Sequence, residues 1–432
     1  MKYEPIAPEL FIENRNRLAQ LLPPNSIAVL NANDPAATNG DGTLPMVVNA
    51  DLFYLSGVEQ EQTILVLNPY AEDENLREIL FLRPSSPENE LWEGHKLTRT
   101  EAQKLTGIKT VRWLAEFPAL FRRLMVAADH VYLNINEHPR AAVEADTRDA
   151  RFIRETRRQY PLHDFRRLAP LMHQLRPVKS DREVALIQRA CDITGKGFER
   201  VARFTKPGVG EFEVEAEFAH EFIRNGAAFA YNPIIASGLN ACCLHYSVNS
   251  ERCRAGELLL LDVAAAYANY NSDLTRTLPV SGRFTRRQKQ VYNAVLRVFR
   301  QSSRNLAPGK TQRQWQKEAE QCMEKELVDL KLISLRDIKQ QNPDQPAVKK
   351  YFMHGIGHSL GLGVHDVTAS GQSLAAGWVM TVEPGIYIPE EKFAVRLEND
   401  VLITPNGNVD LMAKIPIEAD EIEELMQKKR RR

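Results

Sequence analysis

The pentapeptide LLLLD at residues 258–262 decides the fold, and a related pentapeptide, VMTVE, follows at residues 379–383. Each comes shortly after an Ala-Gly pair and ends in a carboxylate six residues after that glycine. An apolar run of this length, bounded by turn residues, predicts a buried strand. A carboxylate at the end of a buried strand is unfavourable unless it is paired, hydrogen-bonded or bound to a metal. Asp262 and Glu383 are therefore candidate site residues.

The residues around these two strands also repeat. In each half a helical pattern, a Pro-Gly pair and a second helical pattern precede the strand, and a further strand with another carboxylate follows it. The second helical patterns cover residues 212–224 and 311–327, and the later carboxylates are Asp273 and Glu398. Several shared features in one order predict two related αβ halves about a pseudo-twofold axis. Such halves bring two pairs of carboxylates together at the centre.

The first third of the chain has a different pattern, in which short apolar runs alternate with helical spacing. Four such runs predict strands at residues 27–30, 63–67, 79–82 and 131–135. Pro177 disfavours continuation of the helix before it. We therefore expect an α/β domain over residues 1–176 and an α+β domain over residues 177–432.

The overall composition excludes several classes of protein. The chain has 56 basic and 56 acidic residues, and this zero net charge argues against a nucleic-acid-binding protein. Its five cysteines are an odd number without a CxxC pair, so we expect no disulfide framework. The start lacks an apolar signal segment, and no apolar run approaches the roughly 20 residues of a membrane span. These features predict a cytoplasmic protein without a membrane partner.

The stretch HGIGHSLG at residues 354–361 supplies candidate imidazoles. It matches neither the GxGxxG phosphate loop nor the HExxH zinc motif. His354, His358 and His365 lie within twelve residues, although the chain has only 10 histidines. A buried, hydrogen-bonded imidazole is the plain alternative for any one of them, just as a turn cap or salt bridge is for any one carboxylate. The clustering favours a functional site.

Four carboxylates and one imidazole form the candidate ligand set, which comprises Asp262, Asp273, His358, Glu383 and Glu398. Four carboxylates carry more negative charge than one divalent ion neutralises, so two ions fit better. Mostly oxygen ligands favour Mn²⁺ or another hard-to-borderline ion over zinc held by thiolates. Two ions roughly 3.5–4 Å apart share one water and lower its pKa, which is the chemistry of hydrolysis.

The motifs LLLLD, NSDLTRT, HGIGHSLGLGVHD, TVEPGIY and VRLENDV occur in the order found in the pita-bread metallopeptidases, and the chain resembles that family. With ADLFYLSG at residues 50–57, it resembles the aminopeptidase P, or Xaa-Pro aminopeptidase, branch. The resemblance implies an α/β N-terminal domain and an α+β C-terminal pita-bread domain that is catalytic. It implies that the candidate set holds two metal ions, with Asp273 and Glu398 as bridging ligands.

The same resemblance implies the reaction and the residues around the substrate. The reaction is metal-dependent hydrolysis of the Xaa-Pro bond at peptide N-termini by a water or hydroxide shared between the metals. The partners are peptides with proline in second position, and Glu383 also handles protons. The substrate-side residues would be His245, His354, His365, Arg396 and Tyr387. The family also implies a homo-oligomer, a dimer or tetramer, in which Trp92 reaches a neighbouring site; a packed surface-loop tryptophan is the alternative.

Two departures from the family pattern keep other functions open. The stretch between Glu383 and Glu398 is shorter than usual, and the loop at residues 369–374 lacks an arginine often found there. A prolidase, which cleaves only Xaa-Pro dipeptides, is therefore the nearest alternative. A metal-free amidinohydrolase of the same fold is disfavoured because all five ligand types are present. A peptidase-like binding module without catalysis is the alternative from a different class.

Overall fold

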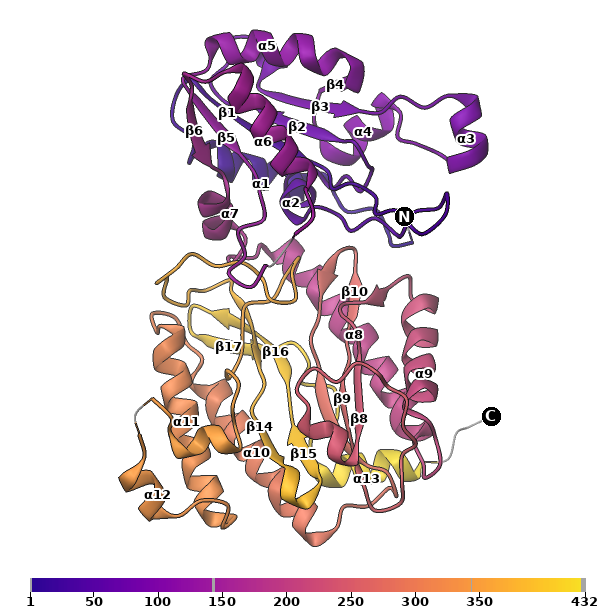
Figure 1. Ribbon diagram of the computed structural model, residues 1–432, viewed down its shortest axis with the longest axis vertical. Coiled ribbons are helices and arrows are strands. Elements are labelled where there is room, and N and C mark those ends of the chain that lie inside the picture. Colours follow the sequence, from indigo (N-terminus) through magenta and orange to yellow (C-terminus); the bar gives the residue numbers. More distant parts are fainter. Residues whose placement is uncertain (1, 142–143, 343, 429–432) are drawn as a thin grey trace. The chain divides into compact units, whose positions relative to one another are not determined.

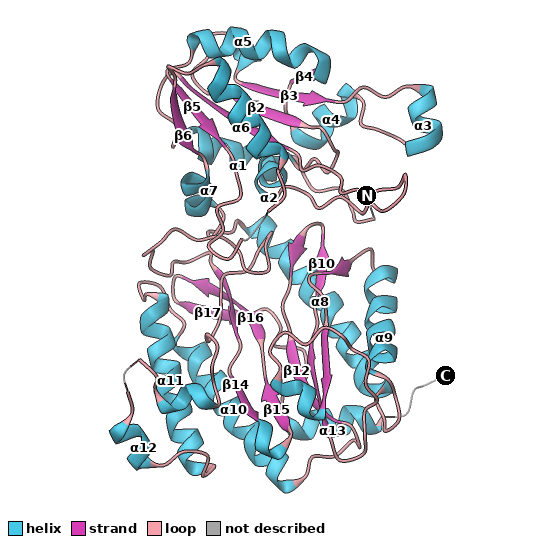
Figure 2. Cartoon of the chain, viewed as in Figure 1, coloured by secondary structure: helices cyan, strands magenta, loops and turns pink. Residues whose placement is uncertain are grey.

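The computed structural model describes residues 2–141, 144–342 and 344–428, shown in Figures 1 and 2. By their internal contacts these residues form two compact units, essentially Tyr3–Arg176 and Pro177–Arg432. We call them the N-terminal and C-terminal units. Among the described helices, none combines the length and the apolar composition that a membrane span needs.

The N-terminal unit is built on one six-stranded mixed sheet, with the strand order β4-β3-β2-β1-β5-β6. Its strands are β1 (Ser26–Asn31), β2 (Ile64–Leu67), β3 (Glu78–Leu82), β4 (Thr110–Trp113), β5 (His130–Leu133) and β6 (Asp164–Arg167). Its helices are α1 (Glu9–Ala19), α2 (Ala50–Ser56), α3 (Pro87–Glu93), α4 (Arg99–Thr106), α5 (Phe117–Ala127), α6 (Arg148–Gln159) and α7 (Ala169–Leu175). Strand β1 is buried along its whole length, and Ile27 and Val29 share a core cluster with Phe117 and Phe121 of α5. The α/β character expected for this part of the chain is confirmed.

The C-terminal unit contains four small sheets and six α-helices in its described residues. The first half of the unit holds α8 (Asp181–Phe204), α9 (Glu211–Arg224), β7 (Ala228–Phe229), β8 (Ile234–Ser237), β9 (Leu258–Asp262), β10 (Ala265–Tyr267), β11 (Tyr270–Asn271) and β12 (Thr275–Pro279). The second half holds α10 (Arg286–Asn305), α11 (Gln312–Asp329), α12 (Leu335–Gln340), β13 (Val379–Val382), β14 (Gly385–Ile388), β15 (Phe393–Arg396), β16 (Asn399–Thr404), β17 (Gly407–Asp410) and α13 (Ala419–Gln427).

The two halves have matching architecture. In the first, helix α8 packs on α9 and the sheet order is β12-β9-β8; in the second, α10 packs on α11 and the order is β13-β16-β17. Figure 1 shows the central strands of this unit between the α8/α9 pair and the α10/α11 pair. The predicted pair of αβ halves is therefore confirmed, and the apolar runs of both pentapeptides are buried strands, β9 and β13.

Candidate metal centre

Two antiparallel strand pairs bring the four predicted carboxylates to the middle of the C-terminal unit. Asp262 ends β9, and Asp273 lies two residues before β12, which pairs antiparallel with β9. Glu383 follows β13, and Glu398 directly precedes β16, which pairs antiparallel with β13. In an antiparallel pair, the end of one strand lies beside the start of the other. Each half of the unit therefore presents two carboxylates at one end of its antiparallel strand pair.

His358 lies beside both pairs of carboxylates. Its Nε2 atom is 3.5 Å from Asp273 Oδ2 and 3.6 Å from Glu383 Oε1. One ligand atom from each of Asp273, His358 and Glu398 falls within a group whose members are all within 4.8 Å of one another. Residues 40 to 125 positions apart in the sequence thus converge in the way that a metal centre requires.

Tyr231, which the sequence analysis missed, joins the two carboxylates of the first half. Its hydroxyl is 2.5 Å from Asp262 Oδ1 and 2.6 Å from Asp273 Oδ1. Burial raises the pKa of Tyr231 well above its usual range, and the negative charges of the two aspartates raise it further. The hydroxyl therefore keeps its proton, which it shares as a hydrogen-bond donor between Asp262 Oδ1 and Asp273 Oδ1.

The electrostatics of the cluster fit the binding of cations. Burial raises the pKa of Asp273 well above its usual range, and repulsion from Asp262 and Asp400 adds to this rise. Glu398 is shifted in the same direction by burial and then by Asp273 and Asp262. Such buried carboxylates must gain protons or positive charge. Bound metal cations would supply that charge, and carboxylates with an imidazole are donors that suit them.

The glycine-rich loop at residues 354–361 packs directly on β13, and this contact fixes the position of His358. The His358 amide donates to Thr381 Oγ1 at 3.0 Å, and the Thr381 amide donates to the His358 carbonyl at 2.9 Å. A Cβ atom on Gly357 would lie 2.0 Å from the Thr381 carbonyl oxygen. Only glycine permits this approach. A Cβ atom on Gly355, in contrast, would meet nothing closer than 3.8 Å.

A chain of polar side chains leads from the cluster to His354. Arg396 is ion-paired with Asp262 and donates from Nη1 to the Tyr387 hydroxyl at 2.7 Å. The Tyr387 hydroxyl lies 2.8 Å from His354 Nε2, while His354 Nδ1 lies 2.8 Å from the Gly355 carbonyl. Burial lowers the pKa of His354 to about 3, and the positive charge of Arg396 contributes. The imidazole is therefore neutral near pH 7: Nδ1 donates to the carbonyl, and Nε2 accepts from Tyr387.

The two remaining predicted histidines also lie in this region. The His365 ring centroid is 4.1 Å from that of His358, and the next residue, Asp366, forms a buried ion pair with Lys179 at 3.2 Å. His245 is exposed, and its neighbours Leu244 and Tyr246 pack against the core cluster that contains Tyr387. The structure thus brings together all ten residues that the sequence analysis selected for the ligand set and the substrate side. Trp92 lies on α3 and is 81% exposed.

Two further polar residues support the ligands and were not predicted. Thr275 donates from Oγ1 to Glu398 Oε2 at 2.6 Å. Asp400 is fully buried and accepts a hydrogen bond from the Asp273 amide at 3.0 Å. Alternation along the strand placed Thr275 on the same face as Asp273, so that signal was available. Asp400 is a charged residue next to the apolar run of β16, and this position was a signal that the sequence offered.

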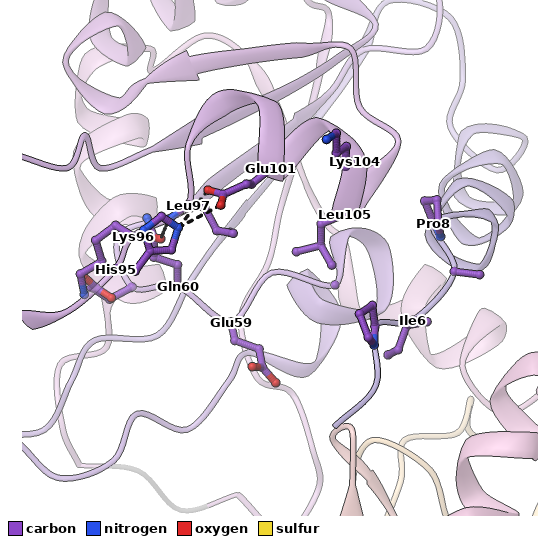
Figure 3. A pocket seen from close by; sticks show the side chains of 14 residues that line it. Ile6, Pro8, Glu59, Gln60, His95, Lys96, Leu97, Glu101, Lys104 and Leu105 are labelled. Carbon is purple, nitrogen blue, oxygen red and sulfur yellow. Dashed lines mark hydrogen bonds and ion pairs between the residues drawn. The ribbon is translucent and has the colours of Figure 1, made fainter. Parts of the chain in front are cut away.

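A separate cavity of about 740 Å³ lies in the N-terminal unit, and Figure 3 shows its lining. Ile6, Pro8 and Leu105 contribute apolar surface, and His95 contacts Glu101 at its edge. All of its lining residues belong to the N-terminal unit, whereas the predicted ligands belong to the C-terminal unit. The cavity and the carboxylate cluster are different features of the molecule.

Comparison with known proteins agrees with this arrangement. The model of metallopeptidase family M24 matches residues 185–405, and the model of the aminopeptidase P N-terminal domain matches residues 11–132. The chain is 33% identical to the Xaa-Pro aminopeptidase of Escherichia coli strain K12, an alignment that covers 98% of each chain. The chain belongs to the aminopeptidase P branch of metallopeptidase family M24. The family inferred from the motifs is therefore confirmed.

Solved aminopeptidase P structures have the same fold over nearly the whole chain. The zinc-substituted E. coli enzyme in complex with product matches with a TM-score of 0.87 and 32% identity, covering 98% of this chain and 99% of that one. The E. coli enzyme with the inhibitor Pro-Leu matches with a TM-score of 0.88 and 31% identity over the same shares. The predicted pita-bread fold is thus confirmed. The Xaa-Pro aminopeptidase of Haemophilus influenzae is also 33% identical over 97% of each chain.

The contact between the glycine-rich loop and β13 gives a testable prediction. The Gly357→Ala variant should lose most of its bound metal, because the added methyl group forces the loop and His358 away from Glu383. The Gly355→Ala variant is the matched control and should bind metal as the wild type does, since its added Cβ makes only ordinary van der Waals contacts, the nearest at 3.8 Å. Metal content after equilibration with Mn²⁺ measures both. Equal metal content in the two variants would contradict the assigned role of this close approach.

Proposed function

We propose that this aminopeptidase P relative removes the first residue from peptides whose second residue is proline, using two divalent ions, with Mn²⁺ as the metal. The observation that carries the proposal is the grouping of Asp273, His358 and Glu398, with one ligand atom from each within 4.8 Å of the other two. The named activity of the E. coli relative, at 33% identity over 98% of both chains, supports the same conclusion.

The assignment of residues follows the geometry of the cluster. We assign the bridging roles to Asp273 and Glu398, and their place together in the group within 4.8 Å supports this assignment. Asp262 and Glu383 are the remaining carboxylates, one from each half of the unit. The proposed ligands are Asp262, Asp273, His358, Glu383 and Glu398, and the proposed substrate-side residues are His245, His354, His365, Arg396 and Tyr387.

The side chains around the cluster have distinct tasks in this proposal. The five proposed ligands would hold the divalent ions, which would supply an activated water and stabilise negative charge on the scissile carbonyl oxygen. Glu383 lies between His358 and His354, with Oε2 3.7 Å from His354 Nδ1, and is placed to take and return a proton. Arg396 and Tyr387 fix the orientation of His354. His245 and His365 face the peptide.

The proline itself explains why such a site is needed. The bond before proline has no N–H, so a site that recognises that N–H loses a contact with this substrate. Recognition must then come from the proline ring and from the carbonyl on its N-terminal side. Histidines near the cluster suit this purpose because they hydrogen-bond the carbonyl and offer a flat surface to the ring.

The finer properties of the protein belong to the same proposal. We propose residues 1–176 as the aminopeptidase P N-terminal domain and residues 177–432 as the catalytic domain, in a cytoplasmic homo-oligomer, dimer or tetramer. The exposure of Trp92 leaves it available to a neighbouring subunit, as the family resemblance implies. Restriction to dipeptides, as in a prolidase, is the second candidate because of the short segment between Glu383 and Glu398.

One preparation tests the activity and the metal requirement together. The purified protein should hydrolyse Xaa-Pro-Yaa peptides, lose activity when a chelator removes its metal, and regain activity with about two Mn²⁺ per chain. The Asp273→Asn variant should stay folded but inactive, because one bridging carboxylate is lost and less negative charge is buried. Activity on Xaa-Pro dipeptides alone would favour the prolidase. Near-normal activity of Asp273→Asn at saturating Mn²⁺ would refute the role of Asp273.

His365 provides a test of the substrate side. The His365→Ala variant should lose about 10²–10³-fold in kcat/KM, the usual effect of removing one donor to a developing oxyanion. Its metal content should remain close to that of the wild type, because His365 contacts the His358 ring and not the carboxylates in this proposal. Steady-state kinetics and metal analysis on the same sample measure both quantities. Recovery of activity by added Mn²⁺ would show that His365 is a ligand instead.

A further inference from the structure

Glu211 is a buried carboxylate that lies outside the metal cluster and has an unusual number of partners. It is the first residue of α9 and is 0% exposed. Its two oxygens accept hydrogen bonds from five donors, all within 2.8–3.4 Å. These donors are the Ser237 amide and hydroxyl, the Asn240 side-chain amide, the Tyr246 hydroxyl and the Glu251 amide.

All five donors come from one segment, residues 237–251, which connects β8 to β9. We call this segment the His245 loop. Glu211 holds both of its ends, through Ser237 and Glu251. It also holds Tyr246, the residue directly after His245, whose hydroxyl donates to Oε2 at 2.8 Å. A single side chain therefore fixes the loop on both sides of His245.

The chemistry of these contacts requires a carboxylate at this position. An ionised carboxylate is an acceptor only, so it satisfies five donors at once, whereas a glutamine would turn N–H groups toward donors. Hydrogen bonds to an ionised acceptor are also roughly twice as strong as bonds between neutral groups. These five hydrogen bonds therefore offset the cost of burying the Glu211 carboxylate. In turn, the carboxylate fixes the conformation of the loop.

We propose that Glu211 is a positioning residue that fixes the His245 loop so that the His245 imidazole faces the substrate. The inference rests on the proposed function, because it takes His245 as a group that contacts the peptide. Leu244 and Tyr246, the neighbours of His245, pack against the core cluster that contains Tyr387, whose hydroxyl lies 2.8 Å from His354 Nε2. The middle of the loop therefore lies at the substrate side. Glu211 itself acts only through the loop.

Glu215, one turn further along α9, supplies a matched control. It accepts one hydrogen bond from this loop, from Asn249 Nδ2 at 2.9 Å. Asn249 is also held by the Pro233 carbonyl and the Ile235 amide, so the loss of Glu215 leaves two bonds in place. A Glu215→Gln variant changes the charge of the same helix by the same amount. It should leave the activity unchanged.

The experiment measures the effect of Glu211→Gln with and without His245. In the otherwise wild-type chain, Glu211→Gln should lower kcat/KM about 10- to 100-fold, the size of effect expected from a slightly misplaced group, with metal content unchanged. In a His245→Ala background, the same change should lower kcat/KM less than about 3-fold, because the side chain that it positions is already gone. A general structural role of Glu211 predicts the same loss in both backgrounds.

A second variant and a hydrogen-exchange measurement test the same inference independently. If Glu211→Gln fails to fold, Tyr246→Phe removes one donor only and should give a smaller loss that likewise disappears with His245→Ala. Amide hydrogen exchange should become faster within residues 237–251 in either variant. Faster exchange with full activity, an equal loss in both backgrounds, or a loss of metal in step with activity would each overturn the inference. An inactive wild-type chain would overturn the proposed function itself, and the inference with it.

Discussion

The repulsion among four neighbouring carboxylates, of which Asp273 and Glu398 are buried, is the constraint on which the rest of this structure depends. Asp273 and Glu398 are 5% and 2% exposed, and each lies close enough to its neighbours for their charges to raise its pKa. Without added cations such a cluster opposes folding, because the burial of unneutralised charge is unfavourable. The fold must therefore hold the carboxylates together by other contacts until metal completes the site.

Those other contacts form a layer of neutral and positive donors around the cluster. Tyr231 donates between Asp262 and Asp273, and Thr275 donates to Glu398. Arg396 reaches Asp262 from the opposite half of the unit. Such outer partners orient metal ligands and adjust their affinity for the ion. The same principle extends outward to Glu211, which stabilises a substrate-side loop and not a ligand.

The sequence was sufficient for the elements whose signals are local. Apolar runs that end in carboxylates predicted β9 and β13, and the repeat of helix, Pro-Gly pair and helix predicted the two halves. The four predicted carboxylate ligands stand out because each lies at or near the end of a buried strand, where charged residues are rare. His358 stands out through the cluster of histidines around it. Edge strands were harder: β4 and β6 are partly exposed and carry Arg and Asp side chains, so they lack the apolar pattern that identifies a central strand.

Contacts between distant segments could not be predicted. Tyr231 is an ordinary residue in the sequence AYNPII, and only the folded chain places its hydroxyl against carboxylates 31 and 42 positions away. Glu211 likewise looks like a surface residue at the start of an amphipathic helix, since several glutamates follow it at partly exposed positions. The role of Glu211 follows from its hydrogen bonds to the His245 loop, and no local sequence pattern predicts that this loop packs on it.

The central claim is that this carboxylate cluster holds two divalent ions. A crystal of the protein grown with Mn²⁺, with anomalous scattering recorded at the manganese edge, tests it most directly. The account predicts two peaks roughly 3.5–4 Å apart, both in contact with Asp273 and Glu398, and one of them within bonding distance of His358 Nε2. One peak only, or two peaks that share neither carboxylate, would contradict it.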